Sequence, residues 1–216
     1  MAKSAPAGEL GPAKRKVLEA AEEEFSRHGF AGARIDAIAA RAGLAKSHVY
    51  YHFEGKQEIF QQLVALRVGE MLAQKDELLA SVTALTPEVV ADFVPRVVTE
   101  LLAPRARFLR VVLLESLGSG DGGQPLLLEV LRPLFADITG RFEALGYELE
   151  RDQFLSDVFH FGVLPAVGHV ALGDRFAKAA GLSPRRAREL FVRRLVDLQA
   201  LNLKQLARRP RRGGSA

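Results

Sequence analysis

Fifteen residues near the N-terminus, AGLAKSHVYYHFEGK from Ala42 to Lys56, concentrate side chains that can do chemistry. Two of the chain's 5 histidines and two of its 3 tyrosines lie there, beside two lysines. Imidazoles bind metals and transfer protons, and imidazole, phenol and ammonium groups also hydrogen-bond nucleic acids. The segment therefore fits a metal site, an acid–base site or a surface that lies on another polymer.

The first two of these possibilities find little support in the sequence. His48 and His52 are four residues apart, as in zinc proteases, but Val49 follows His48, so HExxH is absent and no third ligand is near in sequence. The chain also has no glycine-rich phosphate loop, nucleophile elbow or pair of carboxylates set among apolar residues. We expect no metal, no cofactor and no catalytic residues.

The elements that position these side chains are helices. Apolar residues recur at helical spacing from Ala13 to His28, and Gly29 follows as a left-handed cap that brings Phe30 back onto Phe25. A second helix is predicted over Ile35 to Ala42 and ends at Gly43, the glycine of a tight turn. This arrangement, with the small Ala39 where the helices cross, predicts a helix-turn-helix.

The third helix, predicted to end at about His52, directs Val49 and Phe53 inward. The side chains left outside are Lys46, Ser47, His48, Tyr51 and His52, with Tyr50 at the boundary. A solvated face would mix glutamate with lysine, whereas this face lacks acid, and the second helix of such a motif lies in the DNA major groove. Lys56, at the start of the next helix, is predicted to hold a phosphate with the free N–H groups there.

Residues Lys14 to Phe60 resemble the N-terminal domain of the TetR family of bacterial transcriptional regulators. The motifs that carry the resemblance are FSRHGF, IAARAG and VYYHFEGK, in that order. Ala33, Arg34 and Ala45 stand where the family usually has capping Ser or Thr, at a cost of about 1 kcal/mol for a lost cap. The residues expected to contact DNA are Arg34, Lys46, Ser47, His48, Tyr50, Tyr51, His52 and Lys56.

The rest of the chain is also predicted to be helical. A long helix runs from Lys56 to about Val82, prolines separate helices of ordinary length, and Pro165 predicts a kink inside the apolar segment Phe154 to Leu172. We expect an all-α fold of about nine helices, in which a three-helix domain is joined by the long helix to a C-terminal domain. The expected domains are 1–55 for DNA binding, with 1–12 a flexible arm, 56–207 for effector binding and dimerisation, and 208–216 a basic disordered tail.

The resemblance implies a ligand chamber and a dimer interface in the C-terminal domain. Nine of the 13 phenylalanines lie beyond residue 90, although ordinary core packing also explains them. The candidate ligand-binding residues are Phe93, Phe108, Phe135, Phe159, His160 and His169. The last two helices, about Asp152 to Leu172 and Pro184 to Ala207, are apolar around most of their circumference, so they are expected to pair with those of a second subunit.

Composition limits the setting. The chain has no cysteine, which favours a reducing cytoplasm, and its net charge of +4 favours anionic partners. No signal peptide is expected, and charges are expected to interrupt each apolar run before a membrane span is complete. The run AEEEF in the first helix is expected to be a solvated face.

These observations predict a cytoplasmic, ligand-responsive repressor that binds a palindromic DNA operator as a homodimer, contacts no membrane and is released by a largely apolar small molecule. Two alternatives remain open. One is a helical enzyme with a C-terminal substrate pocket, suggested only by His160 and Asp157. The other is an architectural protein that binds DNA without sequence preference.

Overall fold

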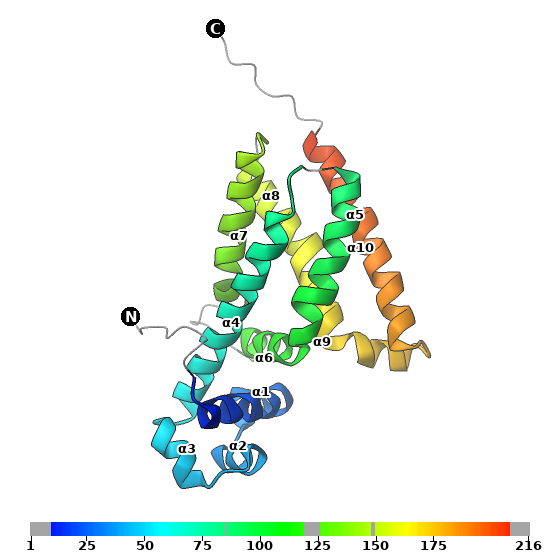
Figure 1. The fold of residues 1–216 in the computed structure, drawn as a ribbon. Helices are drawn as coiled ribbons and strands as arrows, with labels where there is room; N and C mark the ends of the chain where they lie inside the picture. Colours follow the sequence, from blue (N-terminus) through cyan, green and yellow to red (C-terminus); the bar gives the residue numbers. More distant parts are fainter. Residues whose placement is uncertain (1–9, 85, 119–125, 148–149, 208–216) are drawn as a thin grey trace. The chain divides into compact units, whose positions relative to one another are not determined.

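The computed structural model describes residues 10–84, 86–118, 126–147 and 150–207, with only the backbone described at 204–207. The arm expected at 1–12 therefore lies mostly outside the described residues, and the tail expected at 208–216 lies wholly outside them. No strand occurs in the described ranges, which confirms the all-α prediction. The elements (Figure 1) are α1 Pro12–Gly32, α2 Ile35–Ala42, α3 Lys46–His52, α4 Lys56–Ala80, α5 Pro87–Arg96, α6 Ala106–Gly118, α7 Leu126–Ala144, α8 Arg151–Asp157, α9 Leu164–Ala179 and α10 Pro184–Ala207.

Three short helical turns complete the fold. Two are π-helical, η1 over Val97–Leu102 and η3 over Val158–Val163, and η2 over Ala103–Arg105 is a 3₁₀ turn. The segments α8, η3 and α9 run on without a break from Arg151 to Ala179, and α5, η1, η2 and α6 do so from Pro87 to Gly118. The ten α-helical segments of the described ranges therefore form eight continuous helical runs, close to the expected count of about nine.

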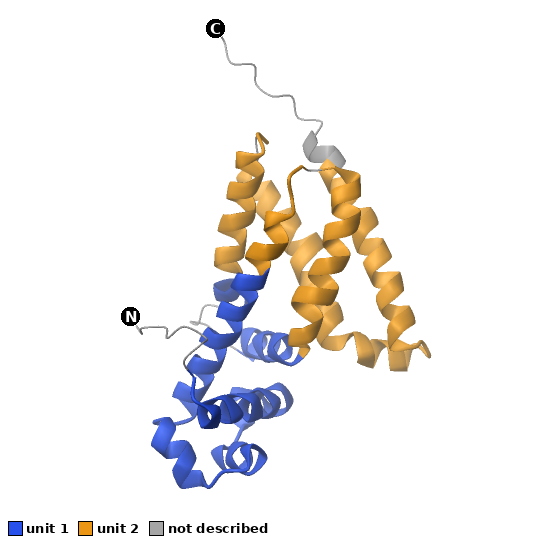
Figure 2. Ribbon diagram, in the orientation of Figure 1, with its two compact units in different colours: residues 1–74, 107–130 blue, residues 75–106, 131–216 orange. Residues whose placement is uncertain are grey.

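The chain divides into two compact units (Figure 2). Unit 1 comprises residues 1–74 and 107–130, and unit 2 comprises 75–106 and 131–216. The division falls inside α4 rather than before it at residue 55, and unit 1 also takes in most of α6 and the start of α7. The first compact unit is therefore larger than the three-helix domain expected from the sequence.

Unit 1 is built on a single apolar core that α1 to α4 and α6 share. Val17, Leu18 and Phe25 of α1 are wholly buried, as are Ile38 of α2 and Ile59 of α4. Val111 of α6 belongs to the same cluster and is also 0% exposed. Helix α6 is thus part of the core of this unit, although about fifty residues separate it in sequence from the third helix.

Two of the three glutamates in the acidic run of α1 are buried, so the expectation of a solvated face was wrong for these two. Glu22 and Glu24 are 7% and 5% exposed. The Arg67 guanidinium on α4 donates to Glu22 Oε2 through Nε and Nη2, at 2.8 and 2.6 Å, and Nη1 donates to Glu70 at 2.9 Å. Buried carboxylates need charged or hydrogen-bonding partners, and here the partner comes from another helix.

Two glycines set the backbone turns of unit 1, as the sequence predicts. Gly43 is left-handed, at φ 68° and ψ 32°, and the Leu44 N–H donates to the Ala39 carbonyl at 3.0 Å in a C-terminal cap. Gly29, at φ 66° and ψ 175°, interrupts α1, but the helix resumes for one further turn to Gly32 instead of ending there. The Phe30 ring does return to Phe25, at a centroid distance of 5.9 Å.

In unit 2, the expected disturbance at Pro165 takes the form of the π-helical turn η3 directly before it. Proline has no N–H to donate to the carbonyl four residues earlier, which belongs to Phe161. Gln199 of α10 donates its side-chain amide to that carbonyl at 2.7 Å. The contact holds α10 along η3 and α9, and α10 also packs against α5.

The helical run Arg151–Ala179 corrects one prediction from the sequence. Its most apolar window has a mean hydropathy of 1.4, so by length and composition it could cross a membrane, and charges do not interrupt it first. Only 17% of that window is buried. Length and composition are weak indications by themselves, but a partly uncovered apolar helix calls for a partner of some kind.

The Arg67–Glu22 pair gives a stability prediction. Replacing Arg67 with Met leaves the Glu22 carboxylate buried without its guanidinium, so the free energy of unfolding should fall by about 3 kcal/mol. Denaturant unfolding followed by circular dichroism measures the change. The control is Arg27→Met, because the Arg27 side chain is 57% exposed and pairs with Glu23 at the surface; its loss should be less than about 1 kcal/mol. Equal losses in the two variants would contradict this account.

Candidate nucleic-acid interface

The orientation of α3 follows from its two inward residues. Val49 is 1% exposed and Phe53 is 2% exposed, and both belong to the core of unit 1. Ser47 and His48 are exposed on the opposite side, and Tyr51 is the most exposed of the large side chains here, at 81%. Tyr50 is half-exposed, whereas His52 is partly buried with its ring edge-on to Tyr51 at 5.0 Å. The face of α3 predicted from residue spacing is therefore directed away from the core, and His52 lies at its edge.

Lys46, the first residue of α3, is held by α2. Its ammonium lies 2.7 Å from the Asp36 carboxylate. The hydrogen bond from Lys46 lowers the pKa of Asp36, and the same contact raises the pKa of Lys46. Both side chains are exposed, so the pair costs little to open when a phosphate competes for the ammonium.

The N-termini of α2 and α3 lack side-chain caps, as expected. Arg34 and Ala45 occupy the two N-cap positions, and neither side chain hydrogen-bonds the first turn of its helix. Arg34 is exposed at the start of α2. Its guanidinium therefore remains a candidate for a phosphate contact on the outward side of the motif.

Lys56 does not stand free as a phosphate anchor. Its ammonium donates to the Ala31 carbonyl at 3.1 Å and to the Ala33 carbonyl at 2.9 Å, and it lies 4.8 Å from the centre of the Phe30 ring. Two of its three N–H donors therefore bind the last turn of α1. The prediction that Lys56 holds a DNA phosphate stays a prediction, and the structure gives the same ammonium a second role in joining α4 to the end of α1.

The start of α4 is also less suited to phosphate than expected. Glu58 lies in the first turn of α4 and accepts a hydrogen bond from the Glu54 N–H at 2.5 Å. A carboxylate at a helix N-terminus stabilises the helix by taking up its free N–H groups and opposing its dipole. The negative charge already at this end disfavours a second anion there.

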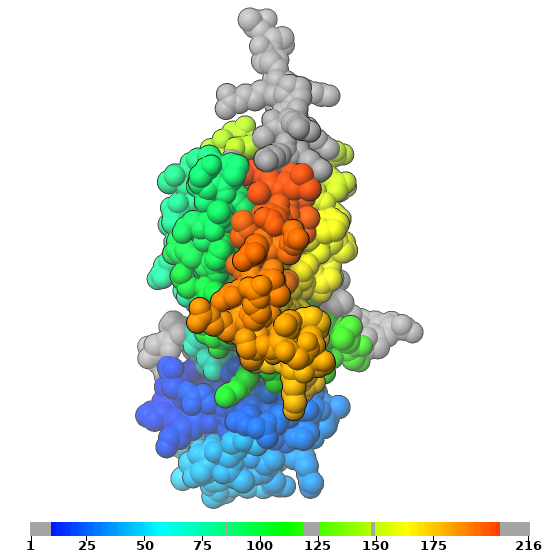
Figure 3. Space-filling model, turned by 90° about the vertical axis from the view of Figure 1, so that its right-hand side faces the viewer, coloured from blue at the N-terminus to red at the C-terminus, as the bar shows by residue number. Residues whose placement is uncertain are grey.

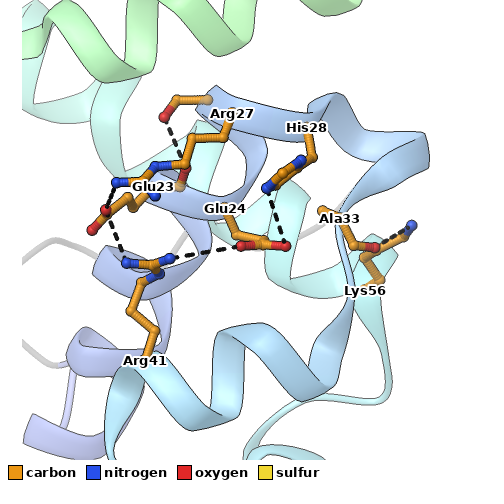
Figure 4. A network of polar contacts seen from close by, with 8 residues as sticks. Glu23, Glu24, Arg27, His28, Ala33, Arg41 and Lys56 are labelled. Atoms are coloured by element: carbon orange, nitrogen blue, oxygen red, sulfur yellow. Dashed lines mark hydrogen bonds and ion pairs between the residues drawn. The ribbon is translucent and has the colours of Figure 1, made fainter.

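Arg41 ties α2 to α1 (Figure 4). Its guanidinium lies 2.9 Å from Glu23 and 4.0 Å from Glu24, and Glu24 also lies 4.0 Å from the His28 imidazole. The acidic run of α1 thus meets one arginine from α2 and another, Arg67, from α4. These contacts fix the helix-turn-helix on α1, and nothing in the spacing of the sequence indicated them.

The predicted ligand-binding residues are divided between the two units. Phe108 is wholly buried and falls in unit 1, whereas the other five candidates fall in unit 2. The rings of Phe135 and Phe159 meet at 6.4 Å, edge to face. His169 stacks on Phe191 at 4.1 Å, and burial together with the nearby Arg188 lowers its pKa. Phe93 is partly buried on α5.

His160 is exposed, contrary to the expectation of a pocket residue. Its Nδ1 lies 2.9 Å from the Ser156 carbonyl, one turn back along the same helix. Asp157, the other residue that suggested an enzyme, accepts a hydrogen bond from Gln153 at 2.8 Å. The contacts found for these two side chains run to Gln153 and Ser156 on their own helical run, and neither contact forms an acid–base pair. In the part of the chain that is described, no three His, Asp or Glu side chains cluster as metal ligands would.

Comparison with known proteins finds similarity chiefly in the N-terminal helices. Residues 17–63 match the model described as bacterial regulatory proteins, tetR family. The HTH-type transcriptional repressor SCO4008 of Streptomyces coelicolor is 32% identical over 112 residues, which is 52% of this chain and 54% of that protein. This chain spans about half, or less, of the length of the curated relatives it matches.

Solved structures with the same fold extend over most of the chain. The fatty acid degradation regulator FadR from Bacillus halodurans aligns with a TM-score of 0.61 at 20% identity, covering 87% of this chain and 96% of that one. The protein in a SmeT–triclosan complex aligns with a TM-score of 0.52 at 21% identity, covering 87% and 91%. Residues 17–63 of this chain, which include the helix-turn-helix, are thus similar to the tetR family of bacterial regulatory proteins.

Proposed function

We propose that this protein is a ligand-responsive transcriptional regulator, a repressor that binds a palindromic DNA operator as a dimer and is released by a small-molecule effector. The observation that carries the proposal is the outward face of α3, where Ser47, His48 and Tyr51 are exposed opposite the buried Val49 and Phe53. The curated relatives are named as regulators or repressors, which supports the same role.

This face has the chemistry to read DNA. Serine, histidine and tyrosine donate and accept hydrogen bonds at base edges, and a tyrosine ring also packs against a thymine methyl group. Arg34 and Lys46 flank the face with positive charge suited to phosphates. We therefore assign base recognition to His48 and Tyr51, and contact with the DNA backbone to Arg34 and Lys46.

The uncovered apolar surface of unit 2 supports a dimer. Figure 3 shows α9 and α10 at the surface that faces the viewer, in colours from yellow to red. The large apolar side chains exposed on η3, α9 and α10 are Phe161, Leu164, Leu172, Phe176, Leu190 and Leu201. A second copy that buries them would also give the dimer two α3 helices. These could read two half-sites whose centres lie about 34–36 Å apart, which is one turn of DNA.

A second subunit explains this surface better than a membrane does. Helix α10 packs beside α9 and carries Arg185, Arg186, Arg188, Arg193 and Arg194. Charged side chains are costly inside a bilayer, so a span at α9 would have to separate from α10. We therefore place the protein in the cytoplasm, where its DNA lies.

The effector site is assigned to the aromatic residues of unit 2. Phe135 and Phe159 form one ring pair, and His169 with Phe191 forms another. Flat apolar surfaces with a few polar groups suit a largely apolar small molecule, and the related SmeT structure contains triclosan. Phe93 remains a candidate for the same site.

Regulation would work by a population shift. Helix α4 is continuous from Lys56 to Ala80, so it begins in unit 1 and ends in unit 2. An effector that binds one arrangement of unit 2 more tightly would change the separation of the two reading heads and weaken operator affinity. Coupling of this kind is typically worth about 1–3 kcal/mol.

Selection of bound duplexes from a random pool tests the proposal, followed by a screen for small molecules that release the DNA. A repressor should recover one palindromic sequence and bind it with a steep salt dependence. Equal affinity for unrelated duplexes would favour an architectural protein instead. Turnover of a released ligand would favour an enzyme.

Substitutions on α3 and at the start of α2 should separate base contacts from phosphate contacts. His48→Ala and Tyr51→Ala should each lose discrimination at particular base pairs, by about 1–3 kcal/mol. Arg34→Ala should weaken all duplexes alike and reduce the salt slope by about one, because it removes one phosphate contact. Fluorescence anisotropy at several salt concentrations measures both effects. Identical behaviour of the three variants would show that this sorting of contacts is wrong.

Dimerisation through α9 gives a separate prediction. Phe176 is 61% exposed on α9, and Phe176→Asp should place a charge in the proposed interface and yield monomers with greatly reduced affinity for a palindrome. Light scattering after gel filtration measures the mass. Leu117→Asp is the control, because Leu117 is 85% exposed on α6, in the other unit, and should leave the dimer intact. A dimeric Phe176→Asp protein would exclude α9 from the interface.

A further inference from the structure

The connection between α1 and α2 contains one isolated turn of helix. Gly29, at φ 66° and ψ 175°, separates residues 30–32 from the rest of α1, and Ala33 is extended at φ −70° and ψ 142°. The Ala33 N–H donates to the Gly29 carbonyl at 3.2 Å, which closes the turn. A single helical turn is unstable by itself, because nucleating a helix fixes several residues for few hydrogen bonds. Side chains from elsewhere must stabilise it.

A carboxylate from α6 stabilises the N-terminal end of this turn. The Phe30 N–H, the first of the turn, donates to Glu115 Oε1 at 2.7 Å, across 85 residues of sequence. The approach is close, since a Cβ on Gly29 would lie 3.3 Å from the same oxygen. Val111, one turn earlier on α6, is buried in the core of unit 1 and holds this face of the helix in place.

An ammonium from α4 stabilises the C-terminal end of the turn. Lys56 donates to the carbonyls of Ala31 and Ala33, and it covers the Phe30 ring, which also meets the Phe60 ring edge-on at 5.1 Å. The turn therefore has a negative charge at its N-terminus and a positive charge at its C-terminus. Both charges oppose the helix dipole and satisfy backbone groups that the turn itself leaves without partners.

We propose that Glu115 and Lys56 form a clamp on the turn at residues 30–32, and that Glu115 is a positioning residue for the DNA-reading helix. The turn leads directly into α2, and α2 packs against α3. Movement of α6 that withdraws the carboxylate frees the Phe30 N–H, loosens the turn and lets α2 and α3 change their angle to α1. This role rests on the proposed function, and it makes α6 a second route, beside α4, by which an effector acts on the reading head.

Amide hydrogen exchange in the free protein tests the clamp without DNA. In Glu115→Ala the Phe30 amide should exchange roughly ten- to a hundredfold faster, as expected for loss of a hydrogen bond to a charged group. The amides of Val17 and Leu18 in the α1 core should keep their rates, which separates local loosening from global unfolding. Glu115→Gln retains an acceptor oxygen and should stay near the wild-type rate. Leu117→Ala, on the exposed side of α6, is the matched control and should change nothing.

Affinity for the duplex selected with the wild-type protein tests the consequence for DNA reading. Glu115→Ala should bind roughly tenfold more weakly with an unchanged salt slope, because no phosphate contact is lost, and Glu115→Gln should recover most of the affinity. Unchanged exchange at Phe30 in Glu115→Ala would overturn the clamp and leave the regulator assignment standing. A faster Phe30 amide with unaltered affinity would refute the positioning role. A wild-type protein that selects no duplex would remove the proposed function, and the role of Glu115 in DNA reading with it.

Discussion

The carboxylates of α1 constrain the whole of unit 1. Glu22 and Glu24 lie inside the fold, and a buried carboxylate is tolerated only when cations or hydrogen-bond donors reach it. Arg67 of α4 meets Glu22, and Arg41 of α2 meets Glu23 and Glu24. The positions of α2 and α4 relative to α1 are therefore fixed by charge as well as by the apolar core. Charged contacts therefore join α1 both to α2 of the helix-turn-helix and to α4.

Within that frame, the two faces of α3 have separate tasks. Val49 and Phe53 anchor the helix in the core and leave the polar side chains outside. The outer residues are then free to vary with the DNA sequence without disturbing the fold, because none of them contributes to the core. Ser47 and His48 are exposed on this face and are where an individual operator preference would arise.

Unit 2 differs from unit 1 in that several of its large apolar side chains are exposed to solvent. The run Arg151–Ala179 is apolar enough to cross a membrane, yet its neighbour α10 is rich in arginine. In the proposed dimer, burial of Phe161, Leu172 and Phe176 against a second copy would remove this apolar surface from water and leave the arginines solvated. In that proposal, the hydrophobic effect would link dimer formation to the symmetry of a palindromic operator.

The sequence alone was sufficient for features that depend on near neighbours. Helical periodicity and the glycines at 29 and 43 predicted α1 to α3, the inward Val49 and Phe53 and the exposed His48 and Tyr51, since each depends on residues within two helical turns. Only the tertiary structure decided the partners of Glu22, Lys56 and Glu115, which lie 45, 23 and 85 residues away in the chain. The partner of a charged group is set by which helices pack together, and residue spacing along one helix carries no information about that choice.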